Sequence, residues 1–450
     1  MRNRFWCCSI GFGALVGFVS ASGAAEMSAR GAFQVDDVVV VSDEMVLPAS
    51  CAEDCAEEAD CGCPDECGDT VGDDCCDAVG CGDTCRSDCG LFGGCELGDP
   101  WDLADEVCGP CRAFDIGGWT QFGYHNNNDG VFNTRPHEFQ LHQGWLYAEK
   151  IADGSDGLGF GGRADAVYGT DGSNTQAFGN PPGSWDFANG WDHGAYGWAM
   201  PQLYVEAAYG DTSVKVGHFF TPMGYQVVPA IGNFFYSIPY TFNFSEAFTH
   251  TGALATHKAS DDVTLYAGYT LGWDTGFDQL NQGNNFLGGA TLALTDDTTV
   301  TYILSAGNLG WIGDNAYTHS IVGTVNLSDK WQYVMQNDVV HVENSINSGG
   351  TTYATVGINQ YLFYTINDCW KAGARVEWWK ADGISLYEMA YGLNYKPTAN
   401  LTIRPEIRYN WCPSDTLPSV LPVVSQVGNS TSVSDYQENT IFGIDAILQF

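Results

Sequence analysis

The residues best suited to chemistry are cysteines, and they cluster in one segment. Residues 51–111 hold thirteen cysteines, eighteen Asp or Glu and one basic residue, Arg86. Their spacing runs C-x3-C-x5-C-x-C-x3-C, then CC, then C-x4-C-x3-C-x3-C-x5-C and C-x12-C-x2-C. Groups of four thiolates suit zinc or copper, whereas dense cysteines in an oxidising compartment become disulfides. We favour disulfides and keep metal binding and cross-linking to the cell wall as alternatives.

Thirteen is an odd number, so one of these cysteines needs a partner elsewhere. Only Cys369 and Cys412 follow residue 111. In the topology described below, Cys369 falls in a turn on the side where the cysteine-rich segment enters. It is therefore a candidate fourteenth partner that would tie this segment to the barrel. Cys412 falls on the opposite side, where it would be free or buried.

Enzymatic chemistry has little support in the sequence. The nine histidines show no HxxxH pair and no metal-ligand spacing. The pair Ser245 and His250 is the best candidate for a barrel hydrolase, but no third residue that would orient the histidine is recognisable. We expect no enzyme, no cofactor and no metal site in this part of the chain.

The chain divides into four zones. Residues 1–25 have a basic start, an apolar stretch and small residues up to Ala25, which is the layout of a secretory signal peptide cleaved near that residue. A retained anchor helix is the alternative. Residues 26–50 form a linker, residues 51–111 the acidic cysteine-rich segment, and residues 112–450 a zone in which cysteine nearly vanishes.

The last zone alternates with the period of two that a β-strand requires. In LTIRPEIRYNW, the side chains from Leu401 to Trp411 at odd positions are apolar apart from the ring hydroxyl of Tyr409, whereas the even positions are polar or charged. About sixteen such segments follow Arg112, each near the ~9 to 11 residues that a tilted strand needs to cross a bilayer. A soluble β-sandwich is the alternative, because it alternates too.

The connections between these segments alternate between short and long. Short turns are expected at 153–157, 210–211, 260–262, 296–297, 328–330, 367–368 and 397–400. Longer loops are expected near 127–136, 170–198, 222–246, 274–284, 308–317, 343–352, 380–388 and 413–439. Short periplasmic turns and long outer loops are typical of outer-membrane barrels. We therefore predict an all-β fold, a transmembrane antiparallel barrel of about 16 strands, with the 51–111 segment on the periplasmic side.

Charge and composition limit the kinds of molecule that the protein is expected to bind. Seventeen basic and fifty-five acidic residues give a net charge of −38, which argues against nucleic acid as a partner. No apolar run after the N-terminus is long enough for a membrane-spanning helix. We expect outer-membrane lipid around the barrel. The last strand ends at Phe450, and a terminal aromatic residue looks like the signal read by barrel-assembly machinery.

The run GHFFTPMGYQVVPAIGNFFYSIPYTFNFSEAFTHTG, residues 217–252, resembles the signature block of the OmpL-like putative β-barrel porin-2 family. The likeness is strongest in TPMGYQVVP, NFFYS and EAFTHTG and extends more weakly over about 112–450. This resemblance implies an outer-membrane porin that passes small hydrophilic solutes without an energy source. The cysteine-rich segment departs from the family, and the resemblance implies nothing about it.

Eight charged residues are expected to face the water-filled lumen: Arg163, Asp165, Glu206, Arg375, Glu377, Arg404, Glu406 and Arg408. One hypothesis is that Arg375, Arg404 and Arg408 form a basic strip opposite Asp165 and Glu206. The alternative is that Arg404 with Glu406 and Arg375 with Glu377 are pairs that only stabilise the wall. Residues 112–450 carry thirty-two acidic and thirteen basic residues, a balance of −19 that favours cations or neutral solutes.

The loop at 222–246 is uncharged up to residue 245, rich in proline and strongly aromatic. It is the third long outer loop, a position that in sixteen-stranded porins commonly folds inward. We predict that it constricts the channel through Tyr225, Asn233, Phe234, Phe235, Tyr236 and Tyr240. An aromatic lid packed on other outer loops is the alternative.

Together these observations predict a porin for passive diffusion of small hydrophilic solutes. An envelope-anchoring protein, in which the barrel only mounts the cysteine-rich segment, is the main alternative. A barrel hydrolase is a remote one. Association into a homotrimer is left open.

Overall fold

The structure is a computed structural model that describes residues 95–109, 114–128, 131–345, 351–416, 418 and 438–450. The predicted signal peptide, the linker and residues 51–94 of the cysteine-rich segment lie outside the described residues.

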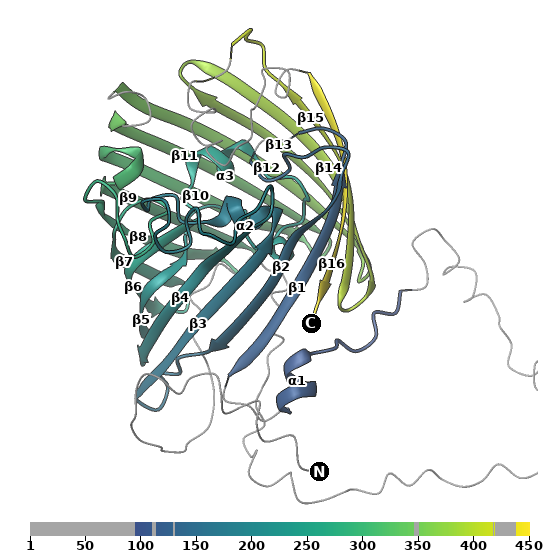
Figure 1. The fold of residues 1–450 in the computed structure, drawn as a ribbon. Coiled ribbons are helices and arrows are strands. Elements are labelled where there is room, and N and C mark those ends of the chain that lie inside the picture. Colours follow the sequence, from purple (N-terminus) through teal and green to yellow (C-terminus); the bar gives the residue numbers. More distant parts are fainter. Residues whose placement is uncertain (1–94, 110–113, 129–130, 346–350, 417, 419–437) are drawn as a thin grey trace, which may run out of the picture.

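Sixteen antiparallel strands form a closed barrel (Figure 1). Each strand pairs with its neighbours in sequence, and β1 closes on β16 with Phe122 opposite Ala446. This confirms the predicted fold class and strand number. The strands are β1 (Asp115–His125), β2 (Phe139–Lys150), β3 (Leu158–Gly169), β4 (Gly197–Tyr209), β5 (Thr212–Phe220), β6 (Thr249–Ser260), β7 (Val263–Thr270), β8 (Asn284–Thr295), β9 (Thr298–Asn308), β10 (Asp314–Ser328), β11 (Trp331–Ser345), β12 (Thr351–Asn367), β13 (Trp370–Ala381), β14 (Ile384–Thr398), β15 (Leu401–Trp411) and β16 (Asn439–Gln449).

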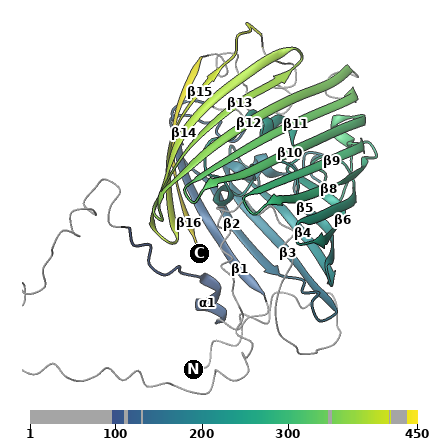
Figure 2. The ribbon, with the colours of Figure 1, turned by 180° about the vertical axis from the view of Figure 1, so that it is seen from behind.

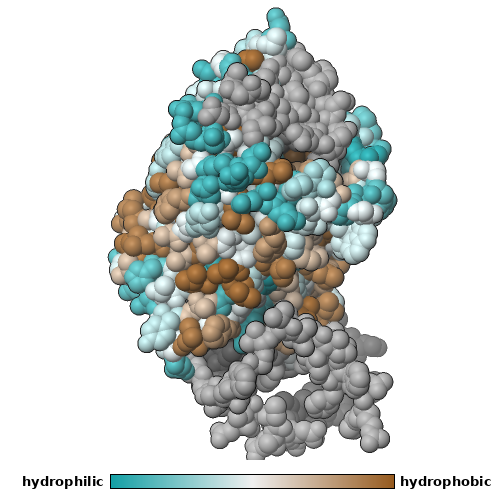
Figure 3. Space-filling model, turned by 60° about the vertical axis from the view of Figure 1, so that its left-hand side comes forward, coloured by the Kyte–Doolittle hydropathy of each residue, from teal (hydrophilic) through white to brown (hydrophobic). Residues whose placement is uncertain are grey.

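The wall alternates as the sequence predicts. In β15, Ile407 and Tyr409 are exposed on the outside, whereas Arg408 between them is buried inside. In β16, Phe442 and Ile444 are exposed on the outside in the same way. Figure 3 shows apolar side chains gathered across the middle of the outer wall, with hydrophilic side chains more common toward the upper end. The outer surface therefore suits contact with hydrocarbon.

Short and long connections lie at opposite ends of the barrel, which we call the turn end and the loop end. One predicted long loop is wrong: β13 and β14 are joined at the loop end by a turn of two residues, Asp382 and Gly383. Both have positive φ (51° and 79°), as a tight hairpin turn requires. Strand lengths also differ from the expectation, ranging from 8 residues in β7 to 17 in β12.

Helical elements are few and short. They are α1 (Leu103–Cys108), α2 (Thr170–Thr175), η1 (Ala230–Gly232), α3 (Tyr240–Ser245) and η2 (Gly310–Ile312). Figure 1 shows α2 and α3 within the ring of strands, whereas α1 lies below the turn end. Within the described residues, no helix combines the length and the hydrophobicity needed to cross a bilayer.

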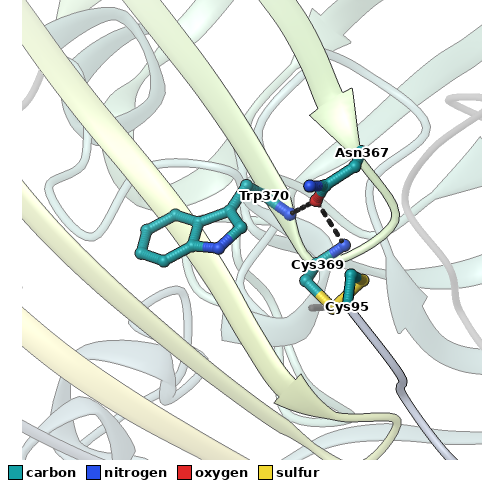
Figure 4. The surroundings of a disulfide bond; sticks show 4 residues. All are labelled: Cys95, Asn367, Cys369 and Trp370. Carbon is teal, nitrogen blue, oxygen red and sulfur yellow. Dashed lines mark hydrogen bonds between the residues drawn. A yellow bond between two sulfur atoms is a disulfide. The ribbon is translucent and has the colours of Figure 1, made fainter. Parts of the chain in front are cut away.

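Residues 95–109, which we call the strap, are fixed to the turn end. Cys95 forms a disulfide with Cys369 in the β12–β13 turn, as Figure 4 shows. Asn400, in the β14–β15 turn, accepts the N–H of Trp101 (2.7 Å) and donates to its carbonyl (2.7 Å). Figures 1 and 2 both place α1 of the strap beside the C-terminus. The predicted pairing of Cys369 with the cysteine-rich segment is thus confirmed, and Cys412 is a buried free thiol.

Candidate functional site

The connection between β5 and β6, residues 221–248, lies inside the barrel, and we call it the inward loop. On one side, Gln143 of β2 donates to the carbonyl of Val228 (2.9 Å). On another, Ser320 of β10 accepts the N–H of Gly224 (3.2 Å). Since these strands lie in different parts of the ring, the inward loop reaches across the lumen rather than over the loop end.

Local sequence sets the shape of the inward loop. Pro229 directly precedes η1 and Pro239 directly precedes α3, where their fixed φ suits the start of a helical turn. Gly224 has a φ of 86°, and a methyl group there would overlap the carboxylate of Glu246. Only glycine fits this conformation and this contact without strain.

Arg404 of β15 satisfies the first part of the loop backbone. Its Nη1 donates to the carbonyls of Ala230 (3.0 Å), Asn233 and Phe235 (3.4 Å). Its Nε donates to Asp445 of β16 at 2.9 Å. An irregular buried segment must find partners for its carbonyl groups, and three of them share the two N–H bonds of this one nitrogen.

Arg375 of β13 and Arg408 of β15 donate hydrogen bonds to the next part of the loop backbone, residues 237 and 238. Arg375 Nη1 donates to the carbonyl of Ser237 (2.8 Å), and Arg408 Nη1 donates to that of Ile238 (2.6 Å). Both guanidinium groups pair with the same carboxylate, Glu388 of β14, at 2.5 and 2.9 Å. Two positive charges and one negative charge are thus buried against the loop.

Two carboxylates accept the N–H groups of the same stretch. Glu406 Oε2 accepts the N–H groups of Tyr236 (2.8 Å) and Ser237 (3.1 Å). Glu377 accepts the first two N–H groups of α3, at 2.7 and 2.6 Å. Carboxylates at the start of a helix compensate both its free N–H groups and its dipole. The inward loop is therefore held by both donors and acceptors of the wall.

Five of the residues expected to line the pore are buried between the wall and the inward loop: Arg375, Glu377, Arg404, Glu406 and Arg408. They contact the loop instead of facing Asp165 and Glu206 across open water. The predicted pairs are also wrong, because Arg375 pairs with Glu388 and Arg404 with Asp445 (both 2.5 Å). Both partners come from a neighbouring strand, and Asp445 of β16 lies directly opposite Arg404 in the strand register.

Aromatic side chains of the loop pack against aromatic side chains of β12. The ring of Tyr225 lies 4.8 Å from that of Tyr361, and the ring of Phe234 lies 5.0 Å from that of Phe363. Phe234 also covers Gly373, where a Cβ atom would collide with its ring. The glycine at position 373 of the wall therefore leaves space for the ring of Phe234.

Tyr236 and Tyr240 extend these contacts. Tyr236 fills the space over Gly443 of β16, and its hydroxyl group hydrogen-bonds to Nε2 of His142 on β2 (2.7 Å). Tyr240 lies under the guanidinium group of Arg408, 4.9 Å from ring centroid to Cζ. These contacts join the loop to both sides of the β1–β16 seam.

A second charged group lies on β2–β5: Glu149, Arg163, Asp165, Glu206 and Lys215, which we call the open-wall cluster. Arg163 pairs with Asp165 (2.7 Å) and Glu149 (3.1 Å), and the side chains of Arg163 and Glu149 are 16% and 30% exposed. Glu206 and Lys215 face each other in register and are half-buried. Among the described residues, no hydrogen bond or ion pair joins this cluster to the inward loop.

The base of the inward loop is fixed by a buried carboxyl group from the β7–β8 loop. Asp274 accepts the N–H groups of Phe248 (2.6 Å) and Thr249 (3.0 Å). Burial raises the pKa of Asp274 to about 7. In the β3–β4 loop, Asp186 similarly accepts the N–H groups of Ala177 (3.0 Å) and Met200 (2.9 Å), and burial raises its pKa to about 6.

The hydrolase candidates do not contact each other. Ser245 Oγ hydrogen-bonds to Thr355 (2.7 Å) and accepts Trp379 Nε1 (2.8 Å). His250 Nε2 hydrogen-bonds to Thr221 (3.0 Å). Nor does the described part of the chain hold any group of three or more His, Cys, Asp and Glu side chains placed to bind a metal ion.

Several residues of the site are not predicted by the sequence pattern. Glu388, the partner of two arginines, was placed in a loop because the two-residue turn at 382–383 was not foreseen. Glu149 and Lys215 were not singled out, although register with Arg163 and Glu206 would have found them once the strand pairing was known.

The chain was compared with known proteins. The family described as "Putative beta-barrel porin-2, OmpL-like" matches residues 113–450. A search of curated proteins found no match. Among solved structures, the anion-selective porin from Comamonas acidovorans is 9% identical, with a TM-score of 0.51 covering 75% of this chain and 99% of that one. The outer membrane channel DcaP of Acinetobacter baumannii is also 9% identical, with a TM-score of 0.50 covering 75% and 97%.

At such low identity, these two structures show likeness of fold alone. The family match is stronger, because it spans the whole barrel from the residues just before β1 to the C-terminus. With its closed ring of sixteen strands and apolar outer wall, the chain belongs to the OmpL-like β-barrel porin-2 family of outer-membrane channel proteins.

Proposed function

We propose that this protein is a passive channel for small hydrophilic solutes, narrowed by the inward loop. The observation that carries the proposal is the anchoring of the loop inside the barrel by Arg375, Arg404 and Arg408 of β13 and β15. The path for water and solutes then runs along the opposite wall, past the open-wall cluster. The barrel acts without enzymatic chemistry.

We infer that selectivity follows from the charges of the open-wall cluster, of which all but the buried Asp165 keep part of their surface exposed. The open-wall cluster has three carboxylates and two basic groups, and the barrel zone as a whole has a balance of −19. Fixed negative charge along a narrow path raises the local concentration of cations. We therefore propose a preference for cations and neutral solutes.

In this proposal the loop end faces the outside of the cell and the turn end faces the periplasm. Lipid of the outer membrane surrounds the barrel, the assembly machinery reads the strand that ends at Phe450, and homotrimers are a further proposed state. Backbone hydrogen bonds between Phe450 and Gly118 (2.9 Å) complete the closure of β16 on β1.

Reconstitution tests the channel function. Purified protein in planar bilayers should give discrete conductance steps, and liposomes that contain it should swell in solutions of small sugars and less in larger ones. A folded protein that gives neither conductance nor swelling would contradict the proposal.

A second candidate function is envelope anchoring, and the strap favours it. The disulfide between Cys95 and Cys369 fixes the end of the cysteine-rich segment to the barrel. A segment joined to the turn end in this way would stay with the barrel under mechanical load. Cells that produce a variant without residues 51–94 should then shed outer membrane. The same variant, purified, should still conduct ions in planar bilayers.

A further inference from the structure

Two buried carboxyl groups meet where the inward loop leaves α3. Glu246 of the loop is 2% exposed and Asp338 of β11 is 0% exposed. Gln336 bridges them, because its Nε2 donates to Glu246 Oε1 (2.6 Å) and to Asp338 Oδ2 (3.0 Å). Ser320 Oγ of β10 donates to the other oxygen of Asp338 (2.6 Å). The two acids thus join the C-terminal arm of the loop to the wall.

No positive charge accompanies this pair. Among the described residues, neither carboxyl group forms an ion pair with Lys, Arg or His. The other acid that faces Glu246 is Glu377, which is engaged with α3, and Arg375 and Arg408 of the same region pair with Glu388. Two ionised carboxylates this close, without a counter-ion and away from water, repel each other strongly.

A single proton removes this conflict. Glu246 Oε2 is buried and receives no hydrogen bond from any donor of the described residues. Because Gln336 Nε2 binds Glu246 Oε1 at 2.6 Å and Asp338 Oδ2 at 3.0 Å, these two oxygens are at most 5.6 Å apart. Neither carboxyl group can donate a hydrogen bond while it is ionised. A proton on either group supplies the missing donor. In keeping with this, burial raises the pKa of Glu246 well above its ordinary value.

We propose that Glu246 and Asp338 share one proton and act as a pH-sensitive latch that holds the C-terminal arm of the inward loop to β11. The effect of the latch on ion flow rests on the proposed channel function, whereas the shared proton does not. Gly224 packs against the carboxylate of Glu246 on one side and Gln336 hydrogen-bonds to it on another, and both acids are buried.

The direction of the pH effect follows from the raised pKa. The folded protein keeps a proton that the unfolded chain releases, so the latch contributes stability at low pH and loses it as the pH rises through the raised value. Once the shared proton leaves, two adjacent negative charges push the loop arm from β11. We expect conductance to rise and become noisier at alkaline pH.

The test compares the full-length wild type with E246Q, D338N and D262N, the last of which changes an exposed turn carboxylate. Infrared difference spectra read the carbonyl stretch of a protonated acid during a pH titration, and planar bilayers read conductance over the same range. In the wild type and D262N, the acid band should disappear as conductance rises. Asp274 and Asp186, whose pKa values are also raised, contribute to the acid band of every variant. The pair accounts for the part of the band that is present in D262N and missing from E246Q, and the conductance of E246Q should be independent of pH.

Several outcomes would overturn the inference. A wild type without the acid band at neutral pH, or an E246Q variant whose band is as strong as that of D262N, would show that the proton is not shared by this pair. A band that titrates without any change in conductance would rule out a latch. If E246Q does not fold, D338N makes the same comparison. A wild type that conducts at no pH would contradict the channel function, while the infrared result would still test the pair.

Discussion

The barrel carries inward-facing charges on two walls, and only those of one wall are hydrogen-bonded to the inward loop. On β13–β15, three arginines are buried, and each donates to the backbone of the inward loop in addition to pairing with a carboxylate of the wall. On β2–β5, the charges pair mainly with each other, and Arg163 and Glu149 keep part of their surface exposed. An inward position alone therefore does not make a charge part of the channel. We infer that a charge covered by the inward loop anchors that loop, whereas a charge left partly exposed can act on passing ions.

The largest effect of a point substitution is expected on the anchoring wall. R404A removes the donor to the carbonyls of Ala230, Asn233 and Phe235 and leaves Asp445 buried without a positively charged partner. Breaking such a buried pair typically costs about 3–5 kcal/mol. We expect the loop to loosen and the single-channel conductance to rise.

The matched control is R163A, which also removes an ion-paired arginine but on the open wall. It should change conductance much less than R404A and leave the loop closed. If the two variants behave alike, the distinction between the walls fails.

Substitutions on the open wall are expected to have a smaller effect, which changes the ion selectivity of the channel and not its conductance. E149Q/E206Q removes two half-buried carboxylates and leaves Arg163 and Lys215 in place. The reversal potential in a salt gradient should shift toward anions, because less fixed negative charge remains along the path. D329N, at an exposed turn, should leave it unchanged. An unaltered reversal potential in E149Q/E206Q would remove this cluster from the channel.

The strap should affect stability and leave conductance alone. C95S opens a disulfide that spans 274 residues, and loss of a disulfide typically costs about 2–5 kcal/mol of stability. Thermal unfolding should occur at a lower temperature in C95S than in C412S, which changes a buried free cysteine. A large change in the conductance of C95S would mean that the strap takes part in the channel.

The smallest effect is expected at the base of the inward loop. Because the pKa of Asp274 is raised from its ordinary value of 3.8 to about 7, the folded state binds a proton that the unfolded state releases. Its contribution to stability is present at acid pH and is lost as the pH rises through about 7. The melting temperature of the wild type should therefore fall over this range more steeply than that of D274N. Parallel curves would exclude Asp274 as the cause.

Much of the fold could be predicted because the outer wall must be apolar at every second residue. The prediction of a long loop at 380–388 is wrong for a physical reason. Inward positions covered by the loop do not face water, so apolar residues such as Leu386 occur there and blur the alternation. The roles of Arg375 and Arg404 could not be foreseen either, since alternation gives the face of the wall but not what packs against it.

The most direct test of the account is the single-channel conductance of a variant that lacks residues 226–238, which include all five loop carbonyls described above as bound by the three arginines. If the inward loop narrows the channel, this variant, folded and heat-stable on gels like the wild type, should conduct more and pass larger sugars into liposomes. A folded deletion variant with the conductance and size limit of the wild type would contradict the account.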